Sequence, residues 1–536
     1  MKKYITILIL TLTIAGSSCK KDFLSLEKNP NVPSVASPQL LLSGALRQTA
    51  GIVNNATANS TGNFGYYTMY AGWSGYISWS TGYQANTAFE QYVITTSTYD
   101  IWTPLYLNLS NYNALIGASA GANFTGIAKI MTVFNFEALV DNYNNVPYSQ
   151  ALKGTKNLTP AYDNGSVIYD DLMKQLDAAI VMIQKAGTGD ANPGKSDIMY
   201  GGNMTNWLKF ANTLKLRLAL RQSNISAKTA ALKAAVAATA SIGYIDGTNG
   251  AVVNPGYTNS DLGGGQQSPL YIAYGLTASG GSSGVNATYQ ANAYAAHFYG
   301  SNNDPRLVQV YSATTTANAA NATSITDGSV DSVSSAKGIA VVSSPFGSSN
   351  PPKGIVPPAT KSANMGPSKY GPGVLKSPTM NANVMSSAEA LFLQAEGVAA
   401  GYIPTGSAQA LYNAGILASF VDDLVPNAAT AAATYIAQPQ IAYPTGGTFA
   451  QQQTAIITQK WAALNLYGAF EAFNEMRRTG IPNVPTSIYP GANAPNQVTR
   501  IPYPFVEFST NAANVGAQPN INDPKYIFTN KIFWAK

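Results

Sequence analysis

Apolar residues recur every three or four positions in several stretches of the chain. Ile168, Leu172 and Leu176 begin one such series, which continues to Ile183 with polar residues between its members. This spacing predicts an amphipathic helix over 168–183. The same pattern predicts helices over 127–138, 207–218, 391–398 and 457–478. Strand patterns are few and short, as at 338–343. We therefore predict a mainly α-helical fold, with helices in pairs and long irregular connections.

Residues typical of helix ends support these boundaries. Thr205 is the predicted N-cap of the helix over 207–218. Ser386 and Glu389 have the spacing of a capping box, and Gly401 is placed to end that helix in a left-handed conformation. The helix over 457–478 ends in the sequence Arg477-Arg478-Thr479-Gly480-Ile481-Pro482, where cations meet the negative end of the dipole and Gly and Pro stop the helix.

Two segments have a different composition. Residues 244–377 are rich in Gly, Ser, Thr, Asn and Pro with little periodicity, apart from a predicted helix near 288–299. Such a segment is a folded functional loop or a disordered one, and its many tyrosines favour folding. Residues 64–83 hold eight aromatic residues in twenty positions, more than one helix stripe can bury. We expect these loops to carry the function.

The N-terminus has the pattern of an export signal. Lys2 and Lys3 precede an apolar run at 5–14 and small residues at 15–18, followed by Cys19, the one cysteine of the chain. This pattern predicts a bacterial lipoprotein signal at 1–18, with Cys19 carrying the lipid anchor and 19–536 forming a single domain. The alternative is a secreted protein whose signal happens to contain a Cys.

The charge content narrows the class of ligand. Only 10% of the residues are charged, against about 25% in typical proteins. Without Lys2 and Lys3 the 31 cationic residues become 29 against 25 anionic ones, a net charge of +4, which does not indicate a nucleic-acid partner. A neutral polar surface suits an exported protein that binds uncharged hydroxylated ligands, and it equally suits a lineage whose secreted proteins are rich in Ala, Thr and Asn.

Catalytic and metal-binding patterns are weak. His297 is the one histidine, and no second His or Cys accompanies it to share a metal, so we expect neither a metal nor a cofactor. The sequence of 280–284 fits a nucleophile elbow, but no convincing strand precedes it and we interpret it as a loop hinge. Glu389 and Glu396 could form a glycosidase pair, although solvated ion pairing on one helix face is the simpler interpretation. An enzyme is therefore a distant alternative.

Aromatic loops offer a more direct chemistry. A neutral sugar is held by stacking on Trp or Tyr, with amides at its hydroxyl rim. We predict a platform formed by Trp73, Tyr76, Trp79 and Tyr83, with Gln84 and Asn86 as hydrogen-bonding neighbours. Second-tier candidates are Tyr271, Tyr274, Tyr299 and Tyr370. The alternative for each ring is packing of the loop onto the helical body, which we expect for Trp207 and Trp461 on their helix stripes.

Six motifs spread along the chain resemble those of one family. Asp22-Phe23-Leu24 and Asn29-Pro30-Asn31 follow the Cys, and 197–217 carries the pattern D-x-x-Y-x-G-x-x-x-x-W-x-K-F-A-N-x-L-K-L-R. Further on come Asp304-Pro305-Arg306, the pair of Ala-Glu steps in 388–396, the motif at 477–482 and Tyr503-Pro504 with Glu507. Together they resemble the SusD/RagB-type nutrient-binding outer-membrane lipoproteins of Bacteroidetes.

The resemblance implies a fold and a role. Such proteins have a mostly helical body with tetratricopeptide-like helix pairs, and irregular loops carry the ligand site. They sit as a lid on a SusC-like TonB-dependent transporter, and they bind and deliver without cleaving. Most characterised members take glycans, while the RagB-like ones take peptides. We thus expect a lipid-anchored, surface-exposed outer-membrane protein that captures oligosaccharide, with peptide capture as the alternative.

Overall fold

The computed structural model describes most of the chain from residue 36 onward. The described ranges are 36–54, 68–79, 85–262, 266–312, 331–334, 340–347, 368–492, 497–523 and 525–536. The predicted signal segment 1–18, Cys19, Tyr83 and Gln84 lie outside them. In the described part, no helix has both the length and the apolar character needed to cross a bilayer.

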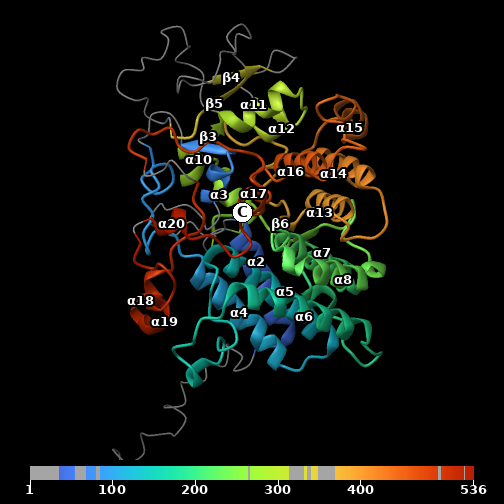
Figure 1. Ribbon diagram of the computed structural model, residues 1–536, viewed down its shortest axis with the longest axis vertical. Helices are drawn as coiled ribbons and strands as arrows, with labels where there is room; N and C mark the ends of the chain where they lie inside the picture. Colours follow the sequence, from blue (N-terminus) through green and yellow to red (C-terminus); the bar gives the residue numbers. More distant parts are fainter. Residues whose placement is uncertain are drawn as a thin grey trace, which may run out of the picture.

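One group of helices fills the lower half of Figure 1. Each helix contacts the next along the chain, and α5 lies between α4 and α6, which buries nearly all of its residues. The predicted helices over 127–138, 168–183 and 207–218 are confirmed as α5, α6 and α7. The members of the group are α2 (Pro38–Val53), α4 (Trp102–Gly117), α5 (Ala122–Tyr143), α6 (Gly165–Gln184), α7 (Met204–Arg221) and α8 (Thr229–Ala238).

A second group lies to the right in Figure 1 and has an apolar cluster of its own. Its helices again pack as neighbours, and α13 joins the two groups through its contacts with α7. The predicted mainly helical body of paired helices is therefore confirmed. The members are α13 (Ser387–Ala399), α14 (Ala408–Asp422), α15 (Ala428–Ile436) and α16 (Phe449–Ala463), followed by α17 (Ala469–Thr479).

Short strands join segments that are far apart in the sequence. The sheet order is β1 (Ile77–Trp79), β3 (Tyr289–Asn292), β5 (Ala340–Ser344) and β4 (Asp331–Ser334), with β3 and β5 parallel and the other pairs antiparallel. The predicted strand at 338–343 is confirmed as β5. A separate antiparallel pair joins β2 (Ala251–Val253) to β6 (Ala382–Met385).

Short helices line the loop regions. The other α-helices of the described residues are α3 (Thr68–Trp73), α9 (Pro269–Tyr274), α10 (Gly284–Thr288), α11 (Ala293–Ser301), α12 (Leu307–Val310), α18 (Phe505–Thr510), α19 (Ala512–Gly516) and α20 (Tyr526–Thr529).

Three predicted boundaries are wrong. The helix over 457–478 is two helices, because the chain turns at 464–468 with Leu466 at φ 69° and with Gly468, where a Cβ would lie 2.6 Å from the Leu464 side chain. The N-cap of α7 is Asn203, whose Oδ1 accepts the Asn206 N–H at 3.1 Å, and not Thr205. The segment 288–299 is not one helix, because Thr288 ends α10, 289–292 form β3 and the chain is helical again only from Ala293, in α11.

The two glutamates of α13 are buried, which corrects the expectation of solvated ion pairing. Glu389 is 2% exposed and accepts a hydrogen bond from Arg217 at 3.2 Å, while Glu396 is 1% exposed and accepts from Arg478 at 2.8 and 2.7 Å. Ser386 caps the helix as predicted, through the Glu389 N–H at 3.0 Å. The Glu389 carboxylate is turned to Arg217, so the reciprocal half of a capping box is replaced by an ion pair.

Candidate ligand-binding site

The aromatic residues of α3 and of the short turn that leads to β1 lie in the core. Trp73 is 1% exposed, and its ring contacts those of Tyr70 and Phe473, each at a centroid distance of 5.6 Å. Its Nε1 donates to the Phe89 carbonyl at 3.1 Å. Tyr76 stacks on Trp461 at 5.3 Å and donates its hydroxyl to the Trp461 carbonyl at 2.6 Å. Both rings therefore pack α3 and β1 onto the helical body.

Three of the second-tier tyrosines are buried in the same way. Tyr299 donates to the Ala462 carbonyl at 2.7 Å, and Tyr274 and Tyr370 contact one another edge to face at 5.4 Å. Burial raises the pKa of all three hydroxyls. A ligand could stack on these rings only if the packing around them opened, so their role in binding stays a prediction.

Trp79 and Tyr271 are the two described candidates with partly exposed side chains. All six tryptophans of the sequence lie in described residues, and Trp79 alone among them is not buried. The Trp79 N–H donates to Glu90 Oε1 at 3.0 Å, and its ring lies 6.3 Å from that of Phe89. The end of β1 is thus held in place, and Trp79 is partly exposed.

The elements that carry Trp79 and Tyr271 are neighbours. Trp79 pairs with Tyr289 across β1 and β3, and the Tyr289 ring contacts Tyr274 of α9 edge to face at 5.4 Å. Tyr271 lies one turn before Tyr274 in the same short helix. Figure 1 shows α3, β3 and α10 gathered at one side of the molecule, below β4 and β5. We call the partly exposed side chains of Trp79 and Tyr271 the aromatic edge.

Other residues singled out from the sequence have structural roles. Asn86 Oδ1 accepts the N–H groups of Ala88 and Phe89 at 3.1 and 2.9 Å, which closes a turn. Ser283 Oγ accepts the Asn286 N–H at 3.1 Å and so caps α10. His297 is exposed on α11, and Trp207 and Trp461 lie in the core as predicted. No cluster of His, Cys, Asp or Glu suited to a metal occurs among the described residues.

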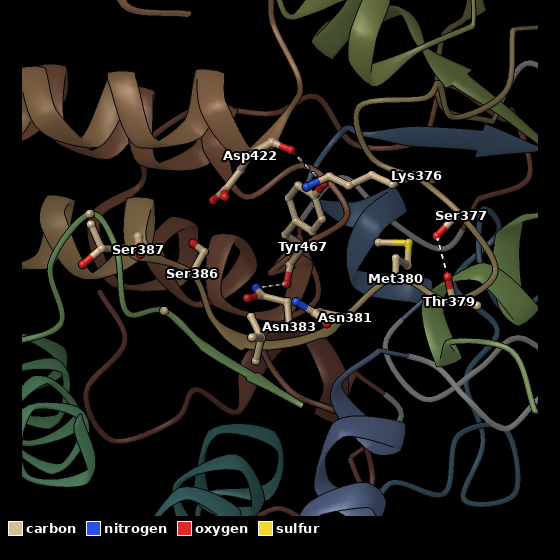
Figure 2. A pocket seen from close by; sticks show the side chains of 14 residues that line it. Lys376, Ser377, Thr379, Met380, Asn381, Asn383, Ser386, Ser387, Asp422 and Tyr467 are labelled. Atoms are coloured by element: carbon tan, nitrogen blue, oxygen red, sulfur yellow. Dashed lines mark hydrogen bonds between the residues drawn. The ribbon is translucent and has the colours of Figure 1, made fainter. Parts of the chain in front are cut away.

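A cavity of about 470 Å³ was not predicted from the sequence. Tyr467, between α16 and α17, lies at its centre in Figure 2, with Lys376 and Asp422 beside the ring and Asn381 and Asn383 below. Its walls come from four segments, 247–252, 376–387, Asp422 and Tyr467, which no sequence pattern links. We call it the Tyr467 pocket.

Comparison with known proteins identifies the family to which this helical protein belongs. The SusD-like family, described as starch-binding and associating with the outer membrane, matches residues 30–504, so the chain belongs to it. Proteins of this family bind nutrients at the outer membrane and are binding proteins rather than enzymes. The resemblance inferred from the six motifs is thereby confirmed.

Solved structures share the fold. An outer-membrane protein of Bacteroides vulgatus has a TM-score of 0.72 at 21% identity, covering 94% of this chain and 100% of that one. A SusD homologue from Bacteroides uniformis gives 0.68 at 23% identity, covering 92% and 99%. A chitin-binding SusD homologue from Flavobacterium johnsoniae gives 0.67 at 22% identity, covering 92% and 98%. No curated protein matches the sequence.

Proposed function

We propose that the protein is a lipid-anchored, cell-surface lipoprotein that captures oligosaccharide and passes it to a SusC-like TonB-dependent transporter. Membership of a family described as starch-binding supports the ligand class, and one neighbour of the same fold binds chitin. The observation that carries the proposal in this chain is the partly exposed residue Trp79, whose strand lies beside the element that bears Tyr271.

The chemistry of the aromatic edge fits a sugar. An apolar ring face of a sugar stacks on an indole or phenol, and each aromatic side chain offers a large contact area with few rotatable bonds. The phenol of Tyr271 also carries a hydroxyl that can bond to the sugar rim. Ligand contact by Trp79, Tyr271 and Tyr83 is part of the proposal, and so is the removal of residues 1–18 before lipidation of Cys19.

Isothermal titration of the protein against neutral oligosaccharides and peptides tests this function. The full-length protein is purified in a detergent whose headgroup contains no sugar, because a maltoside would compete for the site. We expect saturable binding of starch-type or chitin-type oligosaccharides. Clear binding of peptides with no response to any glycan would replace this proposal by the peptide-binding alternative.

Two tryptophan variants separate ligand contact from packing. Trp79→Ala should weaken glycan binding about tenfold, the effect of losing one stacked ring worth roughly 1.4 kcal/mol, while the thermal midpoint changes little. Trp73→Ala serves as the control, since its ring lies in the core and its loss should lower stability first. Unchanged glycan affinity in Trp79→Ala would exclude the aromatic edge as the site.

A further inference from the structure

The Tyr467 pocket is built by elements that hold one another in fixed positions. Its strand walls are the paired β2 and β6, with Ala251 opposite Met385 and Val252 opposite Asn383. Tyr467 is fixed at both ends, because its hydroxyl donates to the Gly373 carbonyl at 2.6 Å and its own carbonyl accepts the Asn383 Nδ2 at 3.1 Å. The cavity is therefore already formed without a ligand.

Neutral hydrogen-bonding side chains dominate the lining. The hydroxyls of Ser377 and Thr379 lie 3.2 Å apart, and Figure 2 shows both at one end of the pocket. Asn381 Oδ1 accepts from Asn254 at 2.9 Å, which leaves its amide donor with no partner among the described residues. Donors and acceptors of this kind match the hydroxyl groups of a polyol, which can accept and donate at once.

The charged groups of the lining balance one another. Lys376 places its Nζ 5.6 Å from the centroid of the Tyr467 ring, and Figure 2 shows Asp422 on the other flank of that ring. Neither forms an ion pair within the part of the chain that the structure describes. One cation and one anion give the lining no net charge, so it favours neither an anionic nor a cationic ligand, and its polar character disfavours a lipid tail.

The size of the cavity sets the size of the ligand. A volume of about 470 Å³ lies within the range of small-molecule sites. At about 30 Å³ per water molecule, it corresponds to roughly fifteen waters, which is room for one or two sugar rings. The aromatic ring of Tyr467, which lines the cavity, supplies an apolar face on which such a ring packs.

We infer that the Tyr467 pocket is a second binding site, for a neutral polyhydroxylated molecule of one or two sugar rings. It shares no lining residue with the aromatic edge, so it does not depend on the function proposed for Trp79. Small sugars bind in the pocket with millimolar affinity, as expected for a shallow polar site open to solvent.

Saturation-transfer NMR on the full-length protein tests this site. The probes are glucose, N-acetylglucosamine, maltose and diacetylchitobiose, with glycylglycine as a zwitterionic comparison and again a detergent without a sugar headgroup. We expect saturable transfer to at least one sugar that persists in Trp79→Ala. A response to glycylglycine alone, or to no probe, would overturn the inference.

Matched variants locate the binding. Both Asn381→Ala and Asn254→Ala remove the hydrogen bond between Asn254 and Asn381. Only Asn381→Ala also removes the amide donor of Asn381 from the pocket, because Asn254 does not line it. We expect Asn381→Ala to weaken sugar binding about fivefold, as for one lost hydrogen bond, and Asn254→Ala to leave the affinity within about twofold.

Lys376→Met is a second variant at an exposed position and should also reduce the affinity. Equal effects of the two asparagine variants, or no effect of Asn381→Ala and Lys376→Met, would refute the pocket. Loss of binding in Trp79→Ala with full binding in Asn381→Ala would assign the sugar to the aromatic edge instead.

Discussion

Arg478 links two helices through a fully buried ion network, and its removal should destabilise the protein. The guanidinium of Arg478, on α17, donates to both oxygens of Glu396 on α13, at 2.8 and 2.7 Å, and its Nε donates to Glu475 at 2.8 Å. The arginine is 1% exposed and Glu475 is 2% exposed. Burial alone would lower the pKa of Arg478, but Glu396 and Glu475 raise it above its usual value, so the group stays charged.

The size of the effect follows from what Arg478→Met leaves behind. Glu396 would keep the Gln453 amide at 2.8 Å and Glu475 would keep Lys460 at 2.8 Å, while both lose their guanidinium bonds. Removing one partner of a buried ion pair costs about 3–5 kcal/mol. With an unfolding entropy of roughly 1 kcal/mol/K for about 500 residues, a loss of about 4 kcal/mol lowers the midpoint by about 4 °C.

A double-mutant cycle in chemical denaturation measures this coupling. Arg478→Met, Glu396→Gln and the double variant should give a coupling of about 2 kcal/mol or more, because in the Glu396→Gln background the loss of Arg478 no longer leaves the Glu396 charge without its guanidinium. Arg47→Met on the exposed side of α2 is the matched control and should change stability by less than about 0.5 kcal/mol. A loss below about 1 kcal/mol for Arg478→Met, or additive single effects, would refute the reasoning.

Three further predictions concern the core. Trp73→Ala should cost about 3–5 kcal/mol in the free energy of unfolding, since it empties a fully buried site. Gly72→Ala should lower the thermal midpoint, because its Cβ would overlap the ring of Phe89. Burial raises the pKa of Asp423 to about 8, so the folded state binds this proton more tightly than the unfolded chain. The stability that the protonated Asp423 contributes is therefore fully present at low pH and is lost as pH rises from about 4 to 8. Denaturation curves measured across that window should show the free energy of unfolding of the wild type falling by about 1.4 kcal/mol per pH unit relative to Asp423→Asn.

Much of the helical body could be predicted because its signals are local. The series beginning at Ile168 and the stop at Gly480 depend on residues one to four positions apart, and both appear in the structure as α6 and the end of α17, where Gly480 has φ 80°. The break between α16 and α17 carries no Pro and only one Gly. That turn is set by packing, since α17 lies against α3, and periodicity cannot report a contact between residues so far apart in the sequence.

The aromatic segment illustrates the limit for the site. The composition of 64–83 predicts rings that one helix stripe cannot bury, but it does not specify which of them face solvent. Trp73 and Trp79 are six residues apart in the same Gly- and Ser-rich context, yet one is in the core and the other is partly exposed. Trp73 is covered by a distant element, because Phe473 of α17 packs on its ring, and the composition of the segment does not report that contact.

The position of the charges explains why the surface suits a neutral ligand better than composition alone suggests. Of the 56 charged residues in the sequence, at least 17 are buried, among them Arg217, Glu389 and Arg478. The interior ion pairs that fix α7, α13 and α17 thus withdraw charge from a surface that had little of it. A sugar approaching such a surface displaces water from amides, hydroxyls and rings rather than from ions, and these contacts are held by stacking and neutral hydrogen bonds, which salt does not screen.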